Sequence, residues 1–221
     1  MKNIIFFVSG EGGSLKFLIE CIHIFKLNIK IIHVVGDREC KALSFSRNLE
    51  IPTSCLNFST QEGMSNLKIL LLESSPELII TNVHKIIPEK LLNLYKNKFL
   101  NLHYSLLPSF KGLIGMKTVD EARKIKTKFI GGTAHIIDEK LDEGIIISQA
   151  VTIVDWSRSD IEIYNEVFRL SCVAFLNAIF ILLNLKNNNL VEVSLNKRVL
   201  YNPPLRFELT NLDETFWKKI K

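Results

Sequence analysis

The stretch IIFFVSGEGGSL occupies residues 4–15 and contains the pattern on which the predicted fold is built. Its first five residues are apolar and mostly β-branched or aromatic, which predicts a strand over Ile4–Val8. A glycine-rich turn follows at once, and the residues from Ser14 to Phe25 have the pattern of a helix. A strand, a tight turn and a helix in this order form the first half of a βαβ unit.

The same alternation of short apolar runs and longer helical patterns continues through the first half of the chain. The apolar runs are continuous rather than alternating, which is typical of parallel strands covered on both faces. The sequence therefore predicts an α/β protein with a mostly parallel, Rossmann-like sheet. The further strands are expected over Ile29–Val35, Leu78–Thr81 and Lys98–His103, and the helices near Glu39–Leu49, Gln61–Ser74 and Pro88–Tyr95.

After residue 125 the pattern changes to longer strand-like runs. Phe129–Ile137 and Ile145–Val154 are joined by a polar loop, which predicts an antiparallel pair. Ser159 and Glu162 have the spacing of a capping box and open a helix that extends to about Leu185. A short C-terminal β-hairpin and a charged tail complete the prediction, with hairpin strands at Val191–Leu195 and Arg198–Tyr201.

Composition limits the classes of protein to consider. With 47% hydrophobic and 23% charged residues, a chain of 221 residues can bury a core, so disorder is not expected. The net charge of +5 is spread along the chain, which does not indicate nucleic-acid binding and suits a small anionic substrate equally well. The apolar stretch Val167–Leu185 contains Arg169 and Asn177, so a buried helix is expected there rather than membrane insertion.

The cysteines and the N-terminal residues predict a cytoplasmic protein. The four cysteines form no CxxC pair and have no zinc-type spacing, so reduced thiols and no metal site are expected: Cys21, Cys40, Cys55 and Cys172. The first apolar run is too short for a secretory signal.

The first stretch with chemical potential is the glycine-rich turn of residues 9–15. Backbone N–H groups at a helix N-terminus, in a loop without bulky side chains, bind phosphate or another anion. The turn is neither a dinucleotide fingerprint nor a P-loop, because Leu15 stands where the last glycine would be and the P-loop lysine is lacking. A plain tight connection is the alternative. The candidate anion ligands are Gly10, Gly12, Gly13 and Ser14.

The second stretch, NLHYSLLPSFKG, occupies residues 101–112 at the end of a predicted strand. Strand periodicity places Asn101 and His103 on the same side, an amide donor beside a titratable imidazole. This pair suits an oxyanion clamp combined with a proton shuttle. A structural histidine at a strand end is the alternative.

The third stretch is the loop that contains Asp142, which follows the predicted strand carrying His135. An acidic loop residue is commonly a solvated turn former. His135 is expected in the core or behind the reacting groups. Spacing alone does not connect Asp142 with His103.

Together the three stretches resemble the formyltransferase family that uses 10-formyltetrahydrofolate. That family has a first Gly-rich loop, an N-x-H-x-S-L-L-P-x-x-x-G stretch and a later L-D-x-G loop in this order, and the similarity covers about residues 1–185. The resemblance implies a sheet of the formyltransferase type and a catalytic set of Asn101, His103 and Asp142. It implies an amine attacking the formyl carbon, with no metal required.

The resemblance also assigns a place to the folate and divides the chain. It implies that 10-formyltetrahydrofolate lies between two segments, with the Gly-rich turn available for the acceptor's phosphate. Residues 1–185 then form the catalytic domain, and residues 186–221 form a hairpin and tail that can join two copies in a homodimer. The implied folate-binding residues are His84, Lys85, Ile86 and Ile87 in one segment and Ile137, Asp138 and Leu141 in the other.

The acceptor is predicted from departures from the family pattern. In phosphoribosylglycinamide formyltransferases a Glu-His pair on the long C-terminal helix helps to hold the substrate, and Ser171 and Cys172 stand at the matching positions here. His84-Lys85 replaces a Met-Arg pair, and the Gly-rich turn differs as well. These changes favour another phosphorylated amine, a nucleotide-linked amino sugar such as dTDP-4-amino-4,6-dideoxyglucose, used for O-antigen polysaccharide.

Other functions stay open beside the amino-sugar prediction. The first alternative is phosphoribosylglycinamide formyltransferase of purine synthesis. The second is a non-catalytic folate- or nucleotide-binding protein, against which the retention of all three catalytic residues argues. Methionyl-tRNA formyltransferase and formyltetrahydrofolate hydrolase carry further domains and are not expected from the length of this chain.

Overall fold

The computed structural model describes residues 1–185 and 199–220, which group into two compact units. The first unit comprises residues 1–100 and 210–221, and the second comprises residues 101–209. The predicted hairpin strand Val191–Leu195 and the residue Arg198 lie outside the described residues. Whether residues 1–185 and 186–221 act as a catalytic domain and a dimerisation element stays a prediction.

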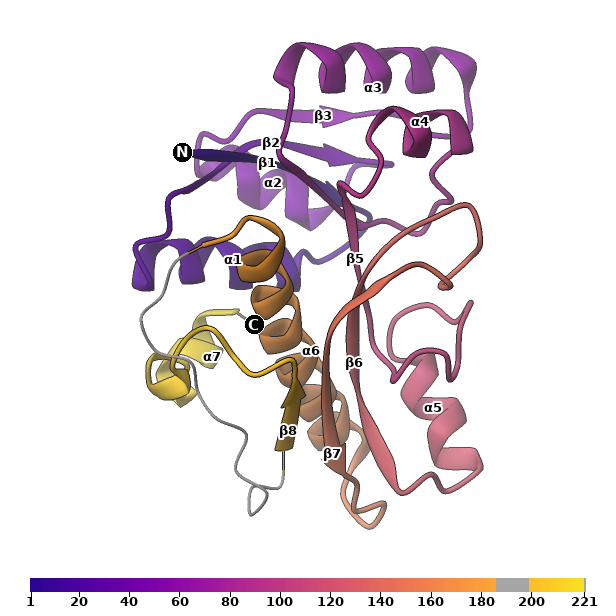
Figure 1. Cartoon of the computed structure of the whole chain (residues 1–221), viewed down its shortest axis with the longest axis vertical. Helices are drawn as coiled ribbons and strands as arrows, with labels where there is room; N and C mark the ends of the chain where they lie inside the picture. Colours follow the sequence, from indigo (N-terminus) through magenta and orange to yellow (C-terminus); the bar gives the residue numbers. More distant parts are fainter. Residues whose placement is uncertain (186–198, 221) are drawn as a thin grey trace. The chain divides into compact units, whose positions relative to one another are not determined.

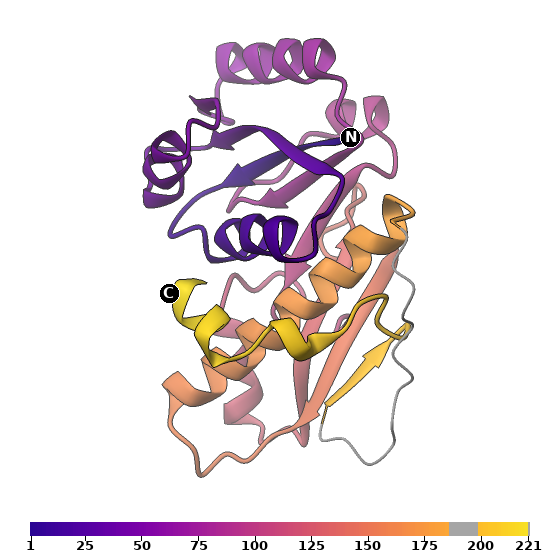
Figure 2. The same ribbon diagram turned by 90° about the vertical axis from the view of Figure 1, so that its left-hand side faces the viewer.

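The first unit is built on parallel strands in the order β3-β2-β1-β4-β5. Helix α1 lies on one face of these strands and α3 on the other (Figures 1 and 2). Burial on both faces explains the continuous apolar runs, since Ile4 to Phe7 of β1 are fully buried. The strands are β1 Lys2–Val8, β2 Ile29–Gly36, β3 Thr53–Cys55, β4 Leu78–Asn82 and β5 Phe99–His103, and the first helices are α1 Gly13–Ile24, α2 Lys41–Asn48, α3 Gln61–Ser74 and α4 Glu89–Leu94.

The second unit is built on antiparallel strands. Strand β6 (Phe129–Ile136) pairs with β7 (Ile146–Ile153), and β7 pairs with β8 (Val199–Asn202). Helix α6 (Asp160–Leu182) packs against both β6 and β7. Its N-terminus has the predicted capping box, in which the Ser159 hydroxyl accepts from the Glu162 amide and the Glu162 carboxylate accepts from the Ser159 amide. The predicted α/β class with a mostly parallel sheet is confirmed.

Some elements differ from the sequence-based expectation, among them the three-residue strand β3 and two helices. Residues 117–124 form helix α5, which the sequence did not predict because it is short and mostly polar. The predicted charged tail instead contains helix α7 (Glu214–Ile220). Its aromatic residues are buried, and Trp217 stacks on Phe17 of α1 with ring centroids 5.4 Å apart. The sequence predicted a tail because lysines surround the few aromatic residues of this segment, and the sequence does not show the surface on which those aromatic residues pack.

Helix α6 is the core helix of the second unit. By length and composition it is the one helix of the described residues that could cross a membrane, yet 67% of its apolar window is buried inside the protein. Asn177 lies on it with no exposed surface. The Asn177 amide nitrogen donates to the Pro203 carbonyl oxygen at 3.0 Å, and its amide oxygen accepts from the Arg206 backbone nitrogen at 3.1 Å. Such burial and pairing fit a core helix.

Close backbone packing joins α6 to β6. A Cβ placed on Gly132 would meet the Ser171 hydroxyl oxygen at 1.9 Å and the Ser171 Cα at 2.7 Å, so only glycine fits there. Ser171 has no exposed surface, and its hydroxyl has no hydrogen-bond partner in the part of the chain that the structure describes. Cys172 is also fully buried. No disulfide is formed by the four cysteines, all of which lie in the described residues.

Replacing Asn177 by alanine is expected to lower the free energy of unfolding by about 2 kcal/mol, because the Pro203 carbonyl and the Arg206 amide lose their buried partner. Chemical denaturation of the variant and of the wild type measures this difference. Asn93→Ala, in an exposed position of α4, is the control and is expected to change stability by less than about 0.5 kcal/mol. Equal stability of the two variants would contradict the assignment of Asn177 to the core.

Ser171→Ala is expected to leave stability unchanged or to raise it by about 1 kcal/mol, because it removes a buried hydroxyl that has no partner. Gly132→Ala adds a methyl group to the same close contact and is expected to lower the free energy of unfolding by about 1–3 kcal/mol. Thermal unfolding of both variants tests the pair. A large loss of stability in Ser171→Ala would mean that the hydroxyl makes a contact that this packing does not include.

Candidate active site

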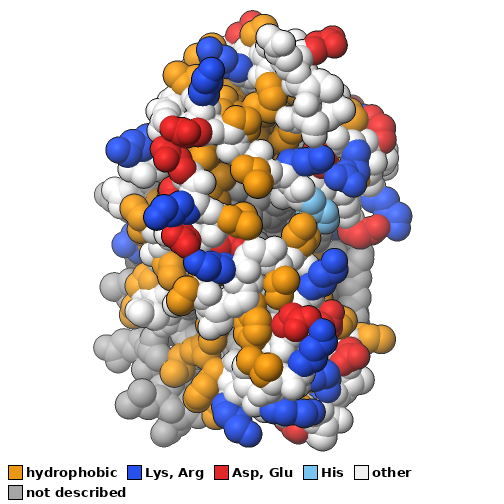
Figure 3. Space-filling view, turned by 90° about the vertical axis from the view of Figure 1, so that its right-hand side faces the viewer, with side chains coloured by type: hydrophobic (Ala, Val, Ile, Leu, Met, Phe, Trp, Pro, Cys, Tyr) orange, Lys and Arg blue, Asp and Glu red, His pale blue; other side chains and the backbone are white. Residues whose placement is uncertain are grey.

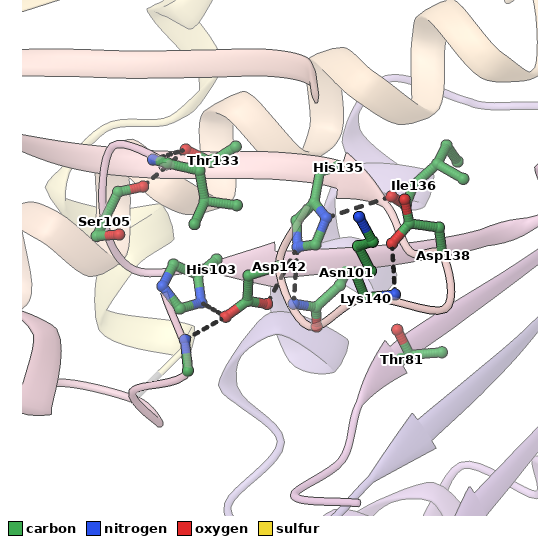
Figure 4. A network of polar contacts seen from close by, with 12 residues as sticks. Thr81, Asn101, His103, Ser105, Thr133, His135, Ile136, Asp138, Lys140 and Asp142 are labelled. Carbon is green, nitrogen blue, oxygen red and sulfur yellow. Dashed lines mark hydrogen bonds and ion pairs between the residues drawn. The ribbon is translucent and has the colours of Figure 1, made fainter. Parts of the chain in front are cut away.

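The candidate catalytic residues gather in the second unit around the Asp142 carboxylate. Asn101 and His103 lie two positions apart at the end of β5, so the pleat of the strand directs both side chains to the same side (Figure 4). The Asp142 carboxylate lies between the imidazoles of His103 and His135. The side chains of His103 and Asp142 are only 6% and 8% exposed. Residues predicted from two of the three stretches, the second and the third, thus form one enclosed polar cluster.

Asp142 is fixed from the opposite loop. One carboxylate oxygen, Oδ2, accepts a hydrogen bond from the Gly112 backbone nitrogen at 2.7 Å and lies 3.5 Å from His103 Nδ1. The other, Oδ1, lies 3.6 Å from His135 Nε2. Catalytic contacts are commonly longer than 3.2 Å in a protein without substrate and shorten when it binds. The carboxylate is therefore placed to orient the His103 ring.

The two nitrogens of His103 both face oxygen atoms. Nδ1 faces Asp142, and Nε2 lies 3.2 Å from the carbonyl oxygen of Phe110. A ring that carries two protons would have an acceptor for each N–H group. Both ring nitrogens of His103 are therefore held by protein oxygens, and a catalytic role for the ring stays a prediction.

His135 supports Asn101 from behind. Its Nε2 lies 3.2 Å from the Asn101 amide nitrogen, and its Nδ1 lies 3.3 Å from the Ile136 carbonyl oxygen. An amide nitrogen can only donate, so Nε2 accepts and the ring proton lies on Nδ1. Burial lowers the pKa of His135, although the nearby Asp142 carboxylate acts in the opposite direction. A neutral ring therefore orients the Asn101 amide.

A hydroxyl that the sequence reasoning missed holds the loop after His103. Thr133 lies on β6, and its hydroxyl donates to the Ser105 carbonyl oxygen at 2.7 Å (Figure 4). The Thr133 hydroxyl oxygen also accepts from the Leu107 backbone nitrogen and from the Gln149 side-chain amide, each at 3.0 Å. Thr133 could have been found from its place two residues before His135, on the same side of the strand.

The Gly-rich turn lies in the first unit and is held against the start of α2. Gly12 has a φ of +78°, and a Cβ on it would meet the Ala42 Cβ at 2.7 Å, so both backbone conformation and space require glycine. The exposed Glu11 carboxylate pairs with Lys41 at 3.1 Å. Ser14 is buried, and its hydroxyl accepts from the Asn82 amide. Binding of an anion by Gly10, Gly12, Gly13 and Ser14 stays a prediction.

The residues predicted to bind folate are divided between the two units. In the first, Ile87 is 4% exposed and belongs to the core, whereas His84, Lys85 and Ile86 are exposed. The His84 backbone nitrogen donates to the Ser9 hydroxyl at 2.9 Å. In the second unit the predicted residues differ in exposure: Ile137 is half-buried, and Asp138 and Leu141 are exposed.

A network of charge lies beside Ser9 in the first unit. The Asp37 carboxylate has no exposed side-chain surface and pairs with Arg38 at 2.8 Å. Burial raises the pKa of Asp37, but hydrogen bonds from Arg38 and Ser9 outweigh it, and the net shift is downward. Asp37 is therefore ionised at neutral pH.

The surface charge is mixed in sign on one face of the molecule (Figure 3). Acidic and basic side chains are interspersed over the face drawn in Figure 3, with no stripe of positive charge there. Among residues 1–185 and 199–220, no group of three or more His, Cys, Asp or Glu side chains has the arrangement of a metal site. A reaction without metal stays a prediction.

Curated relatives carry two kinds of name. Phosphoribosylglycinamide formyltransferase of Haemophilus influenzae is 29% identical over 156 residues, which cover 68% of this chain and 72% of that protein. Formyltetrahydrofolate deformylase of the same organism is 28% identical over 158 residues, which cover 70% of this chain and 55% of that protein. The matched stretch spans about half the length of that deformylase and of a chloroplastic phosphoribosylglycinamide formyltransferase from Vigna unguiculata.

Solved structures share the fold. Phosphoribosylglycinamide formyltransferase of Anaplasma phagocytophilum superimposes with a TM-score of 0.74 at 24% identity, over 91% of this chain and 94% of that chain. A formyltetrahydrofolate deformylase from Pseudomonas syringae pv. tomato also gives 0.74, at 23% identity, over 94% of this chain and 66% of that chain. The model of one family, described as formyl transferase, matches residues 2–179. That match spans most of the chain and includes all the residues around Asp142 described above, so the chain belongs to the formyl transferase family.

Proposed function

We propose that this protein transfers the formyl group of 10-formyltetrahydrofolate to the primary amine of a phosphorylated small molecule, and that phosphoribosylglycinamide is this acceptor. The observation that carries the proposal is the gathering of Asn101, His103 and Asp142 in one enclosed cluster. Transfer of an acyl group needs donors for an oxyanion and a group that moves a proton, and the cluster contains both.

The chemistry assigned to each residue follows from its contacts. The acceptor amine attacks the formyl carbon, and the C=O oxygen becomes an oxyanion that the Asn101 amide and a protonated His103 can hold. His135 orients that amide from behind. Asp142 orients the His103 ring or a relay water, so that the proton lost by the amine reaches N10 of the folate as the C–N bond breaks. Tetrahydrofolate and the formylated amine are the products.

The relatives and the core packing both bear on the acceptor. Phosphoribosylglycinamide formyltransferases are among the curated relatives and the solved structures. The amino-sugar acceptor favoured by the sequence depended partly on Ser171 and Cys172 as changed acceptor residues. Both side chains are fully buried, and Ser171 packs on Gly132, so neither is available to mark an acceptor pocket. Phosphoribosylglycinamide is therefore the better-supported acceptor, and the named relatives give no support for an amino sugar.

Hydrolysis is the second candidate function, because formyltetrahydrofolate deformylases are relatives of similar identity. Water in place of the amine would need the same oxyanion donors and the same proton transfer. A homodimer and a cytoplasmic location stay predictions.

The assay that decides among these reactions follows tetrahydrofolate release from 10-formyltetrahydrofolate in three separate reactions. They contain phosphoribosylglycinamide, dTDP-4-amino-4,6-dideoxyglucose, or no acceptor. Turnover that depends on phosphoribosylglycinamide is the expected result. Equal release without any acceptor would assign hydrolysis, release only with the nucleotide sugar would restore the amino-sugar reading, and silence in all three would favour a binding protein.

His103→Asn is expected to lower kcat by about 100-fold or more, because general acid–base groups contribute on that scale. Asn101→Ala is expected to lower kcat by about 100-fold through the lost oxyanion donor. The dissociation constant for folate, measured by fluorescence or calorimetry, should stay within about threefold for both variants.

The control for these variants is His23→Asn, an exposed histidine of α1. It removes the same ring from the surface and is expected to keep full turnover. If His103→Asn were as active as His23→Asn, the assignment of the proton-transfer group would be wrong.

A further inference from the structure

The loop that carries Asp142 depends on contacts with another loop for its position. Residues 137–145 connect β6 and β7, and the backbone of Asp142 has a φ of +55°, a left-handed conformation that is rare for residues other than glycine. The exposed Lys140 and Leu141 precede it. Local order comes from the turn in which the Glu143 backbone nitrogen donates to the Lys140 carbonyl oxygen at 3.3 Å. A residue in this backbone conformation keeps it only when the surrounding structure holds it there, so contacts from outside the loop matter for the position of Asp142.

The loop of residues 110–112 supplies those outer contacts and also touches His103. The Phe110 carbonyl oxygen lies 3.2 Å from His103 Nε2, and the Gly112 backbone nitrogen donates to Asp142 at 2.7 Å. The residue between them, Lys111, extends its Nζ to Oε1 of Glu143 at 2.5 Å. Glu143 is the neighbour of Asp142 in the chain. The ion pair therefore joins the two loops beside the contact between the two catalytic groups.

We propose that the Lys111–Glu143 ion pair is a positioning device that holds Asp142 in its place opposite His103. Neither side chain touches the reacting groups, so both act through their neighbours, Gly112 and Asp142. The catalytic part of this inference rests on the proposed function. The structural part, the closure of the Asp142–Gly112 contact, does not.

The charge environment of Glu143 distinguishes this ion pair from its neighbours. The hydrogen bond and charge of Lys111 lower the pKa of the Glu143 carboxyl, and Lys140 adds to the effect. Lys140 Nζ lies 3.8 Å from the other carboxylate oxygen but belongs to the same loop as Glu143. Of these two ion pairs of Glu143, the Lys111 pair joins one loop to the other and the Lys140 pair does not, so Lys140 provides a control that removes a positive charge from the same carboxylate.

The size of the effect follows from exposure. The Lys111 and Glu143 side chains are 49% and 40% exposed, so solvent screens the pair and its loss should hardly change global stability. The small free energy of an exposed ion pair is nonetheless enough to shift the equilibrium between the closed and the open Asp142–Gly112 contact about two- to fivefold. Salt should weaken the pair, since the Debye length falls to about 3 Å at 1 M ionic strength.

The direct test is the hydrogen-exchange rate of the Gly112 amide, measured by NMR on the full chain without substrate. K111M and E143Q are expected to raise this rate about two- to fivefold at low salt, and the charge-reversed double variant K111E/E143K is expected to restore it. K140M should leave it within about 1.5-fold of the wild type. The same is expected of K124M, which breaks the exposed Lys124–Glu121 pair of α5 at 2.6 Å. An unchanged rate in K111M, or no recovery in the double variant, overturns the proposal.

Activity gives the second readout. K111M and E143Q are expected to lower kcat about two- to fivefold at low salt with unchanged folate affinity, and the difference from wild type should vanish near 1 M salt. If exchange at Gly112 responds while kcat does not, the pair orders the loop without positioning Asp142 for catalysis, and the inference fails. If the wild type shows no turnover with any acceptor or with water, the proposed function fails, and the exchange experiment still decides the structural part.

Discussion

Burial of the Asp142 carboxylate is the constraint on which the arrangement of the second unit depends. A carboxylate that is 8% exposed must be compensated by donors or opposite charge, since burying a lone charge is costly. The Gly112 amide supplies a short hydrogen bond, and His103 Nδ1 lies 3.5 Å from the same carboxylate oxygen. The loops that carry Asp142 and Gly112 must consequently close on each other before His103 and Asp142 face one another.

The same constraint extends into the sheet. His103 is the last residue of β5. His135 lies near the end of β6, and its side chain has no exposed surface. The Thr133 hydroxyl fastens the chain after His103 through the Ser105 carbonyl and the Leu107 amide. The two histidines are therefore positioned by strands and by hydrogen bonds of the Thr133 hydroxyl. Asp142 is positioned by loops. The cluster combines histidines that lie on strands with an aspartate that lies on a loop.

The sequence was informative where a periodic pattern coincided with a buried element. The apolar runs predicted the first-half strands except β3, which has only three residues, and strand periodicity placed Asn101 and His103 together. The sequence could not give the direction of a side chain on the second half of the long helix, because α6 is apolar on nearly every side there. Ser171 and Cys172 were consequently read as acceptor residues, although one packs on Gly132 and both are buried. The contact of Asp142 with Gly112 likewise depends on loop closure, which no local pattern contains.

The cluster around Asp142 does not by itself select the nucleophile. An attacking amine and an attacking water both create an oxyanion at the formyl carbon and both release a proton, so the roles proposed for Asn101, His103 and Asp142 would suit either reaction. Selection must then lie in groups that bind the acceptor or exclude water, not in the reacting groups. Acceptor choice can change while the cluster stays constant. Relatives named for phosphoribosylglycinamide formylation and relatives named for deformylation show nearly the same identity to this chain, so the identity alone does not select the nucleophile either.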